Sequence, residues 1–241
     1  MFLSALFFEP MITKLPRWVW TGAWVLAFMA GIVNVVGLLG FEHQVVTHLT
    51  GTASMLAALD GPAVLHFAAI IGSFMAGTVL SGFLIQDSTL QLGRRYSVAL
   101  ILESALLCGA VPLLQRGNFG GIYSCACACG LQNAMMSTYS GTVVRTTHLS
   151  GMLTDLGIFL GHTLRGIPVD ARRLRLCLVI ISAFLCGGVA GAFAFRYLSY
   201  ATLFIPGGLA ALIAFGYGIY QIRNRRNAQP RPLANRLSLP R

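Results

Sequence analysis

The apolar residues of this chain occur in long blocks, and this arrangement limits the folds that the chain can adopt. Of its 241 residues, 56% are hydrophobic and only 10% are charged. A soluble domain carries about 25% charged residues, so this chain cannot cover its surface with solvated side chains. A helix of about 20 apolar residues crosses the hydrocarbon core of a bilayer. The sequence therefore predicts an all-α membrane protein.

The apolar blocks number about six. We expect membrane-spanning helices near 18–41, 62–86, 96–114, 118–141, 174–195 and 199–220. The fourth block is rich in Gly, Ser and Cys, and such weak hydrophobicity is common in a span that is buried among other helices. We expect a short cytoplasmic segment, 1–17, before the first span, without the pattern of a cleaved signal peptide. A basic, Pro-rich tail, 221–241, follows the last span and is expected to be disordered.

The distribution of Lys and Arg predicts the orientation of the chain. With six spans, Arg116 and Arg196 fall on one side of the membrane. The other fifteen basic residues fall on the opposite side: Lys14, Arg17, Arg94, Arg95, Arg145, Arg165, Arg172, Arg173, Arg175, Arg223, Arg225, Arg226, Arg231, Arg236 and Arg241. Basic loops stay in the cytoplasm, so both termini are expected there. The net charge of +10 is explained by these loops, and we expect a lipid bilayer rather than nucleic acid as the partner.

Two copies of one polar motif occur in the chain. Residues 47–51 read THLTG and residues 147–151 read THLSG. Asn34 precedes the first motif's Thr by thirteen positions, and Asn133 precedes the second motif's Thr by fourteen. The match indicates an internal repeat.

The residues after each motif extend the match. GSFMAG (72–77) resembles SAFLCG (182–187), so the halves 18–114 and 118–220 each read as span, motif, span, span. Because three spans are an odd number, the second half must cross the membrane in the opposite sense. Two inverted three-helix repeats are typical of secondary transporters.

Each motif is followed by an apolar stretch that is too short to cross a membrane. We expect a short helix there, which could be re-entrant. Thr50 and Ser150 are expected to be the N-caps, each followed by a flexible glycine, Gly51 or Gly151. The N-terminus of such a helix offers free N–H groups and a partial positive charge, which suit an anionic or polar ligand group.

Several polar residues of the expected spans and motifs are candidates for a substrate site. His48 and His148 either form a pseudo-symmetric ligand, proton or gate site, or donate structural hydrogen bonds to a broken backbone. Asn34 and Asn133 either line a cavity with Gln132 or join helices. The full set of predicted substrate-binding residues is Asn34, Thr47, His48, Thr50, Gly51, Glu103, Gln132, Asn133, Thr147, His148, Ser150 and Gly151.

Glu103 lies in the middle of the third expected span. A carboxyl group inside a membrane is costly and is a candidate for function, although it can be protonated and merely hydrogen-bonded. Cys125, Cys127 and Cys129 form the pattern C-A-C-A-C, in which only the first and third share a helix face. Cys is a common small buried residue, so we expect no bound metal, no cofactor and no disulfide framework.

One stretch of the chain resembles a known family. GIVNVVGLLGFEHQVVTHLTGTASML (31–56), followed by CGLQNA (129–134) and the second THLSG, resembles the YoaK-like family of bacterial inner-membrane proteins, over about 17–220. The resemblance implies a multi-pass fold in the bacterial inner membrane and a domain of unknown function. Many members carry Asp at the position of Asn34 and TGN in place of TGT, so carboxylate-driven proton coupling at position 34 is in doubt.

These features favour a permease for a small solute or ion, with its site between the two motifs. The alternative is a non-transporting structural or regulatory partner of another membrane complex. A membrane enzyme is less favoured, because the chain has no nucleophile elbow, phosphate loop or zinc-helix motif. The sequence leaves open the substrate, the coupling ion and whether the chain forms an oligomer.

Overall fold

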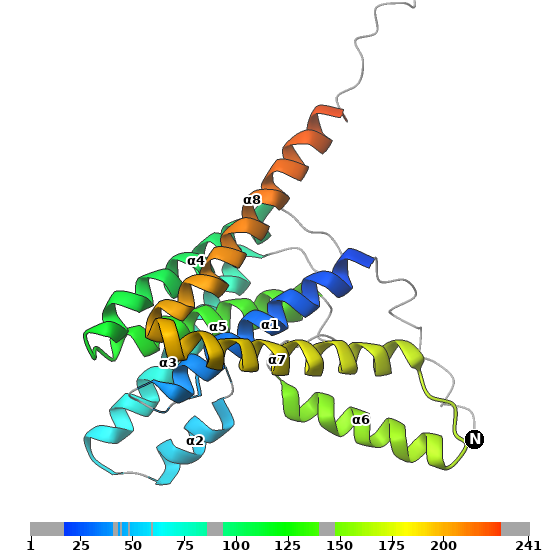
Figure 1. Ribbon diagram of the computed structural model, residues 1–241, viewed down its shortest axis with the longest axis horizontal. Coiled ribbons are helices and arrows are strands. Elements are labelled where there is room, and N and C mark those ends of the chain that lie inside the picture. Colours follow the sequence, from blue (N-terminus) through cyan, green and yellow to red (C-terminus); the bar gives the residue numbers. More distant parts are fainter. Residues whose placement is uncertain are drawn as a thin grey trace, which may run out of the picture.

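A computed structural model describes residues 17–40, 43, 45–47, 49–58, 60–85, 94–139 and 148–227 (Figure 1). The long helices are α1 (Arg17–Leu39), α3 (Pro62–Leu84), α4 (Arg94–Gln115), α5 (Gly120–Tyr139), α7 (Ala171–Leu198) and α8 (Phe204–Asn227). The short ones are α2 (Leu49–Ala58), α6 (Leu149–Leu164) and the 3-10 helix η1 (Ser199–Leu203). No strand occurs in the described ranges, and each expected span corresponds to one long helix.

Several of these helices are apolar and long enough to cross a membrane. Four stretches meet both conditions: Trp20–Leu39, Pro62–Leu84, Arg95–Gln115 and Ala171–Gln221, the last of which contains α7, η1 and the part of α8 before Ile222. The helix α5 is not among them, in line with its content of Gly, Ser and Cys. The fold is therefore that of a multi-pass, all-helical membrane protein.

The helix α8 extends further than the sequence predicts. Residues 221–227 continue it to Asn227, so the prediction of a disordered tail from residue 221 is wrong for these seven residues. Residues 228–241 lie outside the described part of the chain.

The long helices of the first half pack mainly against those of the second half. In Figure 1, α1 runs against α7, α5 runs against α3, and α4 packs between α5 and α8. Each short helix lies beside the long helix that follows it, α2 on α3 and α6 on α7. The two halves are thus interlocked and do not form separate bundles.

The crossing of α1 and α7 depends on glycine. A Cβ atom added at Gly31 would overlap the carbonyl oxygen of Phe184 on α7. In return, a Cβ added at Gly187 of α7 would overlap the carbonyl oxygen of Phe28 on α1. Small residues allow helix backbones to approach closely in membranes, where there is little hydrophobic force between helices.

The crossing of α3 and α5 has equivalent contacts, in which α5 takes the place of α1 and α3 takes the place of α7. A Cβ added at Gly130 of α5 would overlap the carbonyl oxygen of Phe74, and one added at Gly77 of α3 would overlap that of Cys127. Gly130 follows Gly31 by 99 positions, as Cys127 follows Phe28. The matched segments 72–77 and 182–187 therefore occupy equivalent places at the two crossings.

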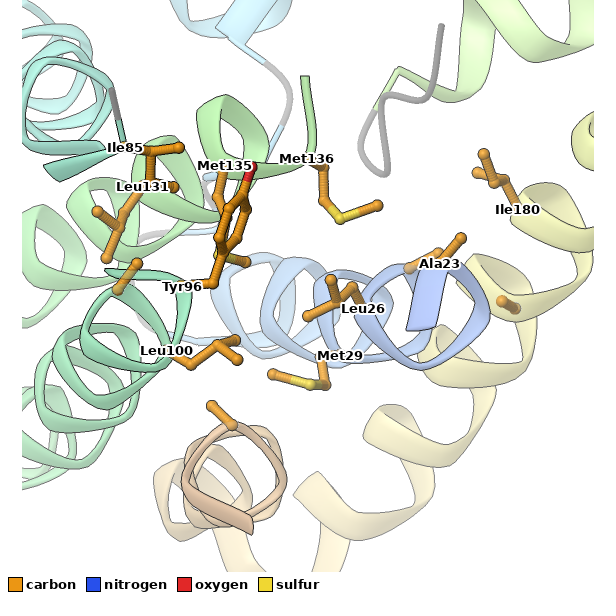
Figure 2. Packing of buried hydrophobic residues seen from close by; sticks show 14 of the residues in the cluster. Ala23, Leu26, Met29, Ile85, Tyr96, Leu100, Leu131, Met135, Met136 and Ile180 are labelled. Carbon is orange, nitrogen blue, oxygen red and sulfur yellow. The ribbon is translucent and has the colours of Figure 1, made fainter. Parts of the chain in front are cut away.

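The core lies where α1, α4 and α5 meet. Figure 2 shows Leu26 and Met29 of α1, Tyr96 and Leu100 of α4, and Leu131 of α5 in this cluster. The helix α5 is buried along much of its length, including Leu131 at 0% exposure. This confirms the expectation that the least apolar span lies among other helices, since a helix that does not face lipid needs no apolar surface.

Candidate functional site

The first polar motif folds back onto α1. The Thr47 hydroxyl donates a hydrogen bond of 2.6 Å to the Asn34 side-chain oxygen. Thr47 is buried, as is its neighbour Val46. The bond fixes the chain before α2 against the last part of α1. The thirteen-residue spacing seen in the sequence therefore corresponds to a real contact.

Asn133 and Thr147 are the residues of the second half that correspond to Asn34 and Thr47, and only Asn133 is among the described residues. Asn133 lies in α5, and its side-chain oxygen is buried without a hydrogen-bond partner among the described residues. Its expected partner, Thr147, lies outside the described residues, as does His48. A buried polar atom without a partner is uncommon in proteins, because its desolvation is not compensated.

Gln132 joins α5 to α1, the two long helices that precede the polar motifs. This side chain is buried, and its Nε2 donates to the Leu26 carbonyl oxygen of α1 at 3.3 Å. Gln132 thus contributes to the packing of α5 on α1, which is the helix-joining interpretation that the sequence left open.

Glu103 is buried in the middle of α4. It is 3% exposed, and its Oε2 has no hydrogen-bond partner in the described part of the chain. The carboxyl group lies within electrostatic range of the Cys129 thiol on α5. Asn133 lies one turn after Cys129, on the same face of α5. Glu103 and Asn133 thus each carry a buried side-chain oxygen without a partner among the described residues.

The start of each short helix corrects a prediction. The helices α2 and α6 begin at Leu49 and Leu149, so Thr50 and Ser150 lie inside the first turn and are not N-caps. His148 occupies the N-cap of α6 without a side-chain capping bond. The earlier start is consistent with the apolar Leu in each motif being part of the helix.

The motif residues at these helix starts do not converge. Thr50, Gly51 and Ser150 are exposed. The helices α2 and α6 do not contact each other in the described ranges. His148 is also exposed, and its ring lies over Gly151, where a Cβ would overlap Nδ1. Among the described residues, the predicted site between the two motifs therefore keeps only its buried residues, because those at the two helix starts are exposed and lie apart.

The short helices nevertheless share a local feature. The Ser54 hydroxyl donates to the Thr50 carbonyl oxygen at 3.0 Å, and the Thr154 hydroxyl donates to the Ser150 carbonyl oxygen at 2.9 Å. These bonds lie 100 positions apart in the chain. The two helix starts are therefore similar in structure as well as in sequence.

Sequence reasoning missed several buried polar groups. Thr202 of η1 is 0% exposed, and its hydroxyl has no hydrogen-bond partner among the described residues. His66 of α3 lies 3.0 Å, Nδ1 to Oη, from Tyr123 of α5. The ring of Phe119 is tilted against the His66 ring, with 4.7 Å between their centroids. The signal for His66 is the position of a histidine inside an apolar span, which is rare.

The cysteines remain thiols in the structure. Cys125 and Cys129 are buried on one face of α5, and Cys127 is half-buried on another. Within the described ranges, no three His, Cys, Asp or Glu side chains are grouped so that they could hold a metal ion. The cysteine pattern therefore contributes small side chains to the packing of a buried helix.

Comparison with known proteins gives one match. The model of the family "Protein of unknown function (DUF1275)" matches residues 22–216. The chain belongs to this family. No curated protein and no solved structure matches the chain. The match begins within α1, ends within α8 and contains both polar motifs, so the interlocked helices and their buried polar groups lie within the family's domain.

Proposed function

We propose that this member of the DUF1275 family is a permease for a small solute or ion, akin to the YoaK-like proteins of the bacterial inner membrane. The observation that carries the proposal is the pair of buried oxygens of Glu103 and Asn133, which have no partner among the described residues. A carboxyl group inside a membrane span is costly and is usually kept for function. Both oxygens are buried, one on α4 and one on α5.

The exchanged glycine contacts support an inverted repeat. If the second half crosses the membrane in the opposite sense, a two-fold axis in the membrane plane relates Gly31 to Gly130 and Phe184 to Phe74. That operation turns the α1–α7 crossing into the α5–α3 crossing, which has the same contacts. Transporters of this type bind their substrate near the repeat axis and rock one repeat against the other.

The chemistry of the site favours a particular kind of solute. The unpartnered atom of Asn133 is an acceptor, and that of Glu103 is an acceptor when the carboxyl group is ionised, so a cation or a solute that donates hydrogen bonds would satisfy either one. The exposed helix starts at Thr50 and Ser150 offer main-chain donors instead and would suit a polar or anionic group elsewhere on the path.

The second candidate function is a non-transporting partner of another membrane complex. One observation favours it: Asn34 and Gln132 already have partners, Thr47 and Leu26, as expected of side chains that only join helices. On this alternative the two unpartnered oxygens would be tolerated without binding anything.

Thermal unfolding of the detergent-purified chain separates the two candidates. Ammonium, guanidinium, sodium, potassium and urea would be tested against a sulfate and acetate series. A ligand that binds only the native state raises its stability, by about 2.7 kcal/mol at one hundred times the Kd. We expect stabilisation by a donor or cation that is lost in Glu103→Gln and in Asn133→Leu but kept in the matched control Gly72→Ala. Stabilisation by none of them, with both variants at least as stable as the wild type, would favour the non-transporting partner.

Flux into proteoliposomes would then test transport directly. The ligand identified by unfolding should enter vesicles that contain the wild-type chain, and Glu103→Gln should slow its entry by tenfold or more. Equal flux into vesicles with and without the protein would contradict the permease.

A further inference from the structure

The connection between α6 and α7, residues 164–175, is a tightly built elbow. Gly166, with φ at +69°, ends α6, and the Ile167 N–H donates to the His162 carbonyl oxygen at 2.9 Å. Asp170 then caps α7 by accepting a 2.9 Å hydrogen bond from the Arg172 main-chain N–H. Because α6 packs back along α7, this α6–α7 elbow is held at the end of both helices (Figure 1).

The α6–α7 elbow is strongly cationic. It carries four exposed arginines, which are Arg165, Arg172, Arg173 and Arg175. Its only acidic residue, Asp170, is engaged as the cap of α7. The first turn of α7 adds the partial positive charge of a helix N-terminus. Anionic groups are therefore attracted to this end of the molecule.

The same elbow also exposes aliphatic side chains. Leu164 is 88% exposed and Ile167 is 39% exposed, directly beside Arg165. Leu160, one turn before Leu164, is exposed as well. Aliphatic side chains flanked by arginines are characteristic of helices that lie at a membrane interface, where the alkyl groups enter the acyl region and the charges stay with the headgroups.

The corresponding elbow of the first half lacks this chemistry. Between α2 and α3 the chain carries Asp60, Gly61 and Pro62, and residues 49–84 contain no Lys or Arg at all. The fold therefore does not require the basic and aliphatic side chains of the α6–α7 elbow, since the α2–α3 elbow joins the same kind of helices without them.

We propose that the α6–α7 elbow binds the phosphate headgroups of anionic phospholipids, with Leu164 and Ile167 inserted beside the acyl chains. Arginine guanidinium groups form paired hydrogen bonds with phosphate oxygens. Clusters of four or more basic residues next to a membrane helix bind anionic lipid, and each basic residue contributes about a fivefold gain in affinity. The inference is independent of the permease proposal, because it requires neither Glu103 nor transport.

Lipid binding to the full-length chain in detergent micelles tests this proposal. Dioleoyl phosphatidylglycerol, dioleoyl phosphatidylcholine and inorganic phosphate would be titrated separately. We expect phosphatidylglycerol to bind more tightly than phosphatidylcholine, and its affinity to fall by on the order of several hundredfold when Arg165, Arg172, Arg173 and Arg175 are all changed to Gln. The control changes Arg116 and Arg196, two exposed arginines that belong to no basic cluster, to Gln and should lower the affinity far less.

A second variant keeps the test decisive if the arginine variant does not fold. Leu164→Ser with Ile167→Ser changes only exposed side chains, so the melting temperature should stay the same while phosphatidylglycerol affinity falls several-fold. Binding of inorganic phosphate should not change in this variant. An equal loss in the variant that lacks Arg116 and Arg196, equal binding of phosphatidylcholine, or full binding by the serine variant would overturn the proposal.

Discussion

At the α1–α7 crossing Gly31 leaves room for the main chain of Phe184, and at the α3–α5 crossing Gly130 leaves room for that of Phe74. The two crossings are alike because helix backbones this close accept no side chain larger than hydrogen. The polar contacts described beside them are not alike: Asn34 is bonded to Thr47, whereas Asn133 has an oxygen without a partner among the described residues, which do not include Thr147. Packing is thus shared by both halves, and the described polar contacts differ.

The two elbows also share their packing and differ in their charged side chains. Both join a short helix to the long helix on which it packs, but one carries Asp60 and the other carries four exposed arginines. Features that both halves share are those that the fold needs. We therefore expect function to reside in the features that they do not share.

The largest effects are expected at the glycine crossings. Gly31→Ala and Gly130→Ala should each lower the free energy of unfolding by about 2–3 kcal/mol, because the new methyl group forces two backbones apart. Gly77→Ala and Gly187→Ala should behave in the same way. Thermal unfolding in detergent measures these losses.

Two glycines on α3 provide the control. Nothing lies within 4 Å of a Cβ added at Gly72 or Gly82, so Gly72→Ala and Gly82→Ala should be neutral or stabilising by up to about 1 kcal/mol. A loss at Gly31 without a matching loss at Gly130 would break the equivalence of the two crossings.

A smaller effect is expected where the halves differ. Thr47→Val removes the donor to Asn34 and should cost about 1 kcal/mol, because the Asn34 oxygen is left unpaired. Asn133→Leu should cost nothing or stabilise the chain, since it removes an oxygen that has no partner among the described residues. Unfolding of the two variants side by side tests the asymmetry. Equal losses would show that Asn133 has a partner of equal strength.

The smallest loss from breaking an observed hydrogen bond is expected at Gln132. Gln132→Leu loses one 3.3 Å hydrogen bond to Leu26, and interhelical bonds in membranes average about 0.6 kcal/mol. The same unfolding assay applies. A loss above about 2 kcal/mol would mean that Gln132 does more than join α5 to α1.

Much of the fold could be predicted from the sequence, because apolar blocks determine where membrane helices form. The six long helices and the two short ones follow from hydrophobic length and from the repeated motif. The ends were less predictable: α8 continues through Arg223 to Asn227, because basic side chains do not stop a helix. The starts of α2 and α6 were misplaced by the preference of Thr and Ser for N-caps.

The candidate site was less predictable than the fold. The spacing of Asn34 and Thr47 indicated a real bond, and Glu103 was found from the cost of burying a carboxyl group. The sequence could not show that Gln132 reaches Leu26 or that Thr50 and Ser150 are exposed, because these depend on how distant helices cross. His66 was missed because its partner, Tyr123, lies 57 positions away in the chain.

The most direct test concerns the opposite orientation of the two halves. Asp60→Cys and Pro168→Cys place one exposed thiol at each elbow, and the unsubstituted chain is the control for the native cysteines, all of which lie on helices. A membrane-impermeant maleimide should label position 60 only from outside intact cells and position 168 only in inside-out vesicles. Labelling of both positions from the same side would contradict the inverted repeat and the permease built on it.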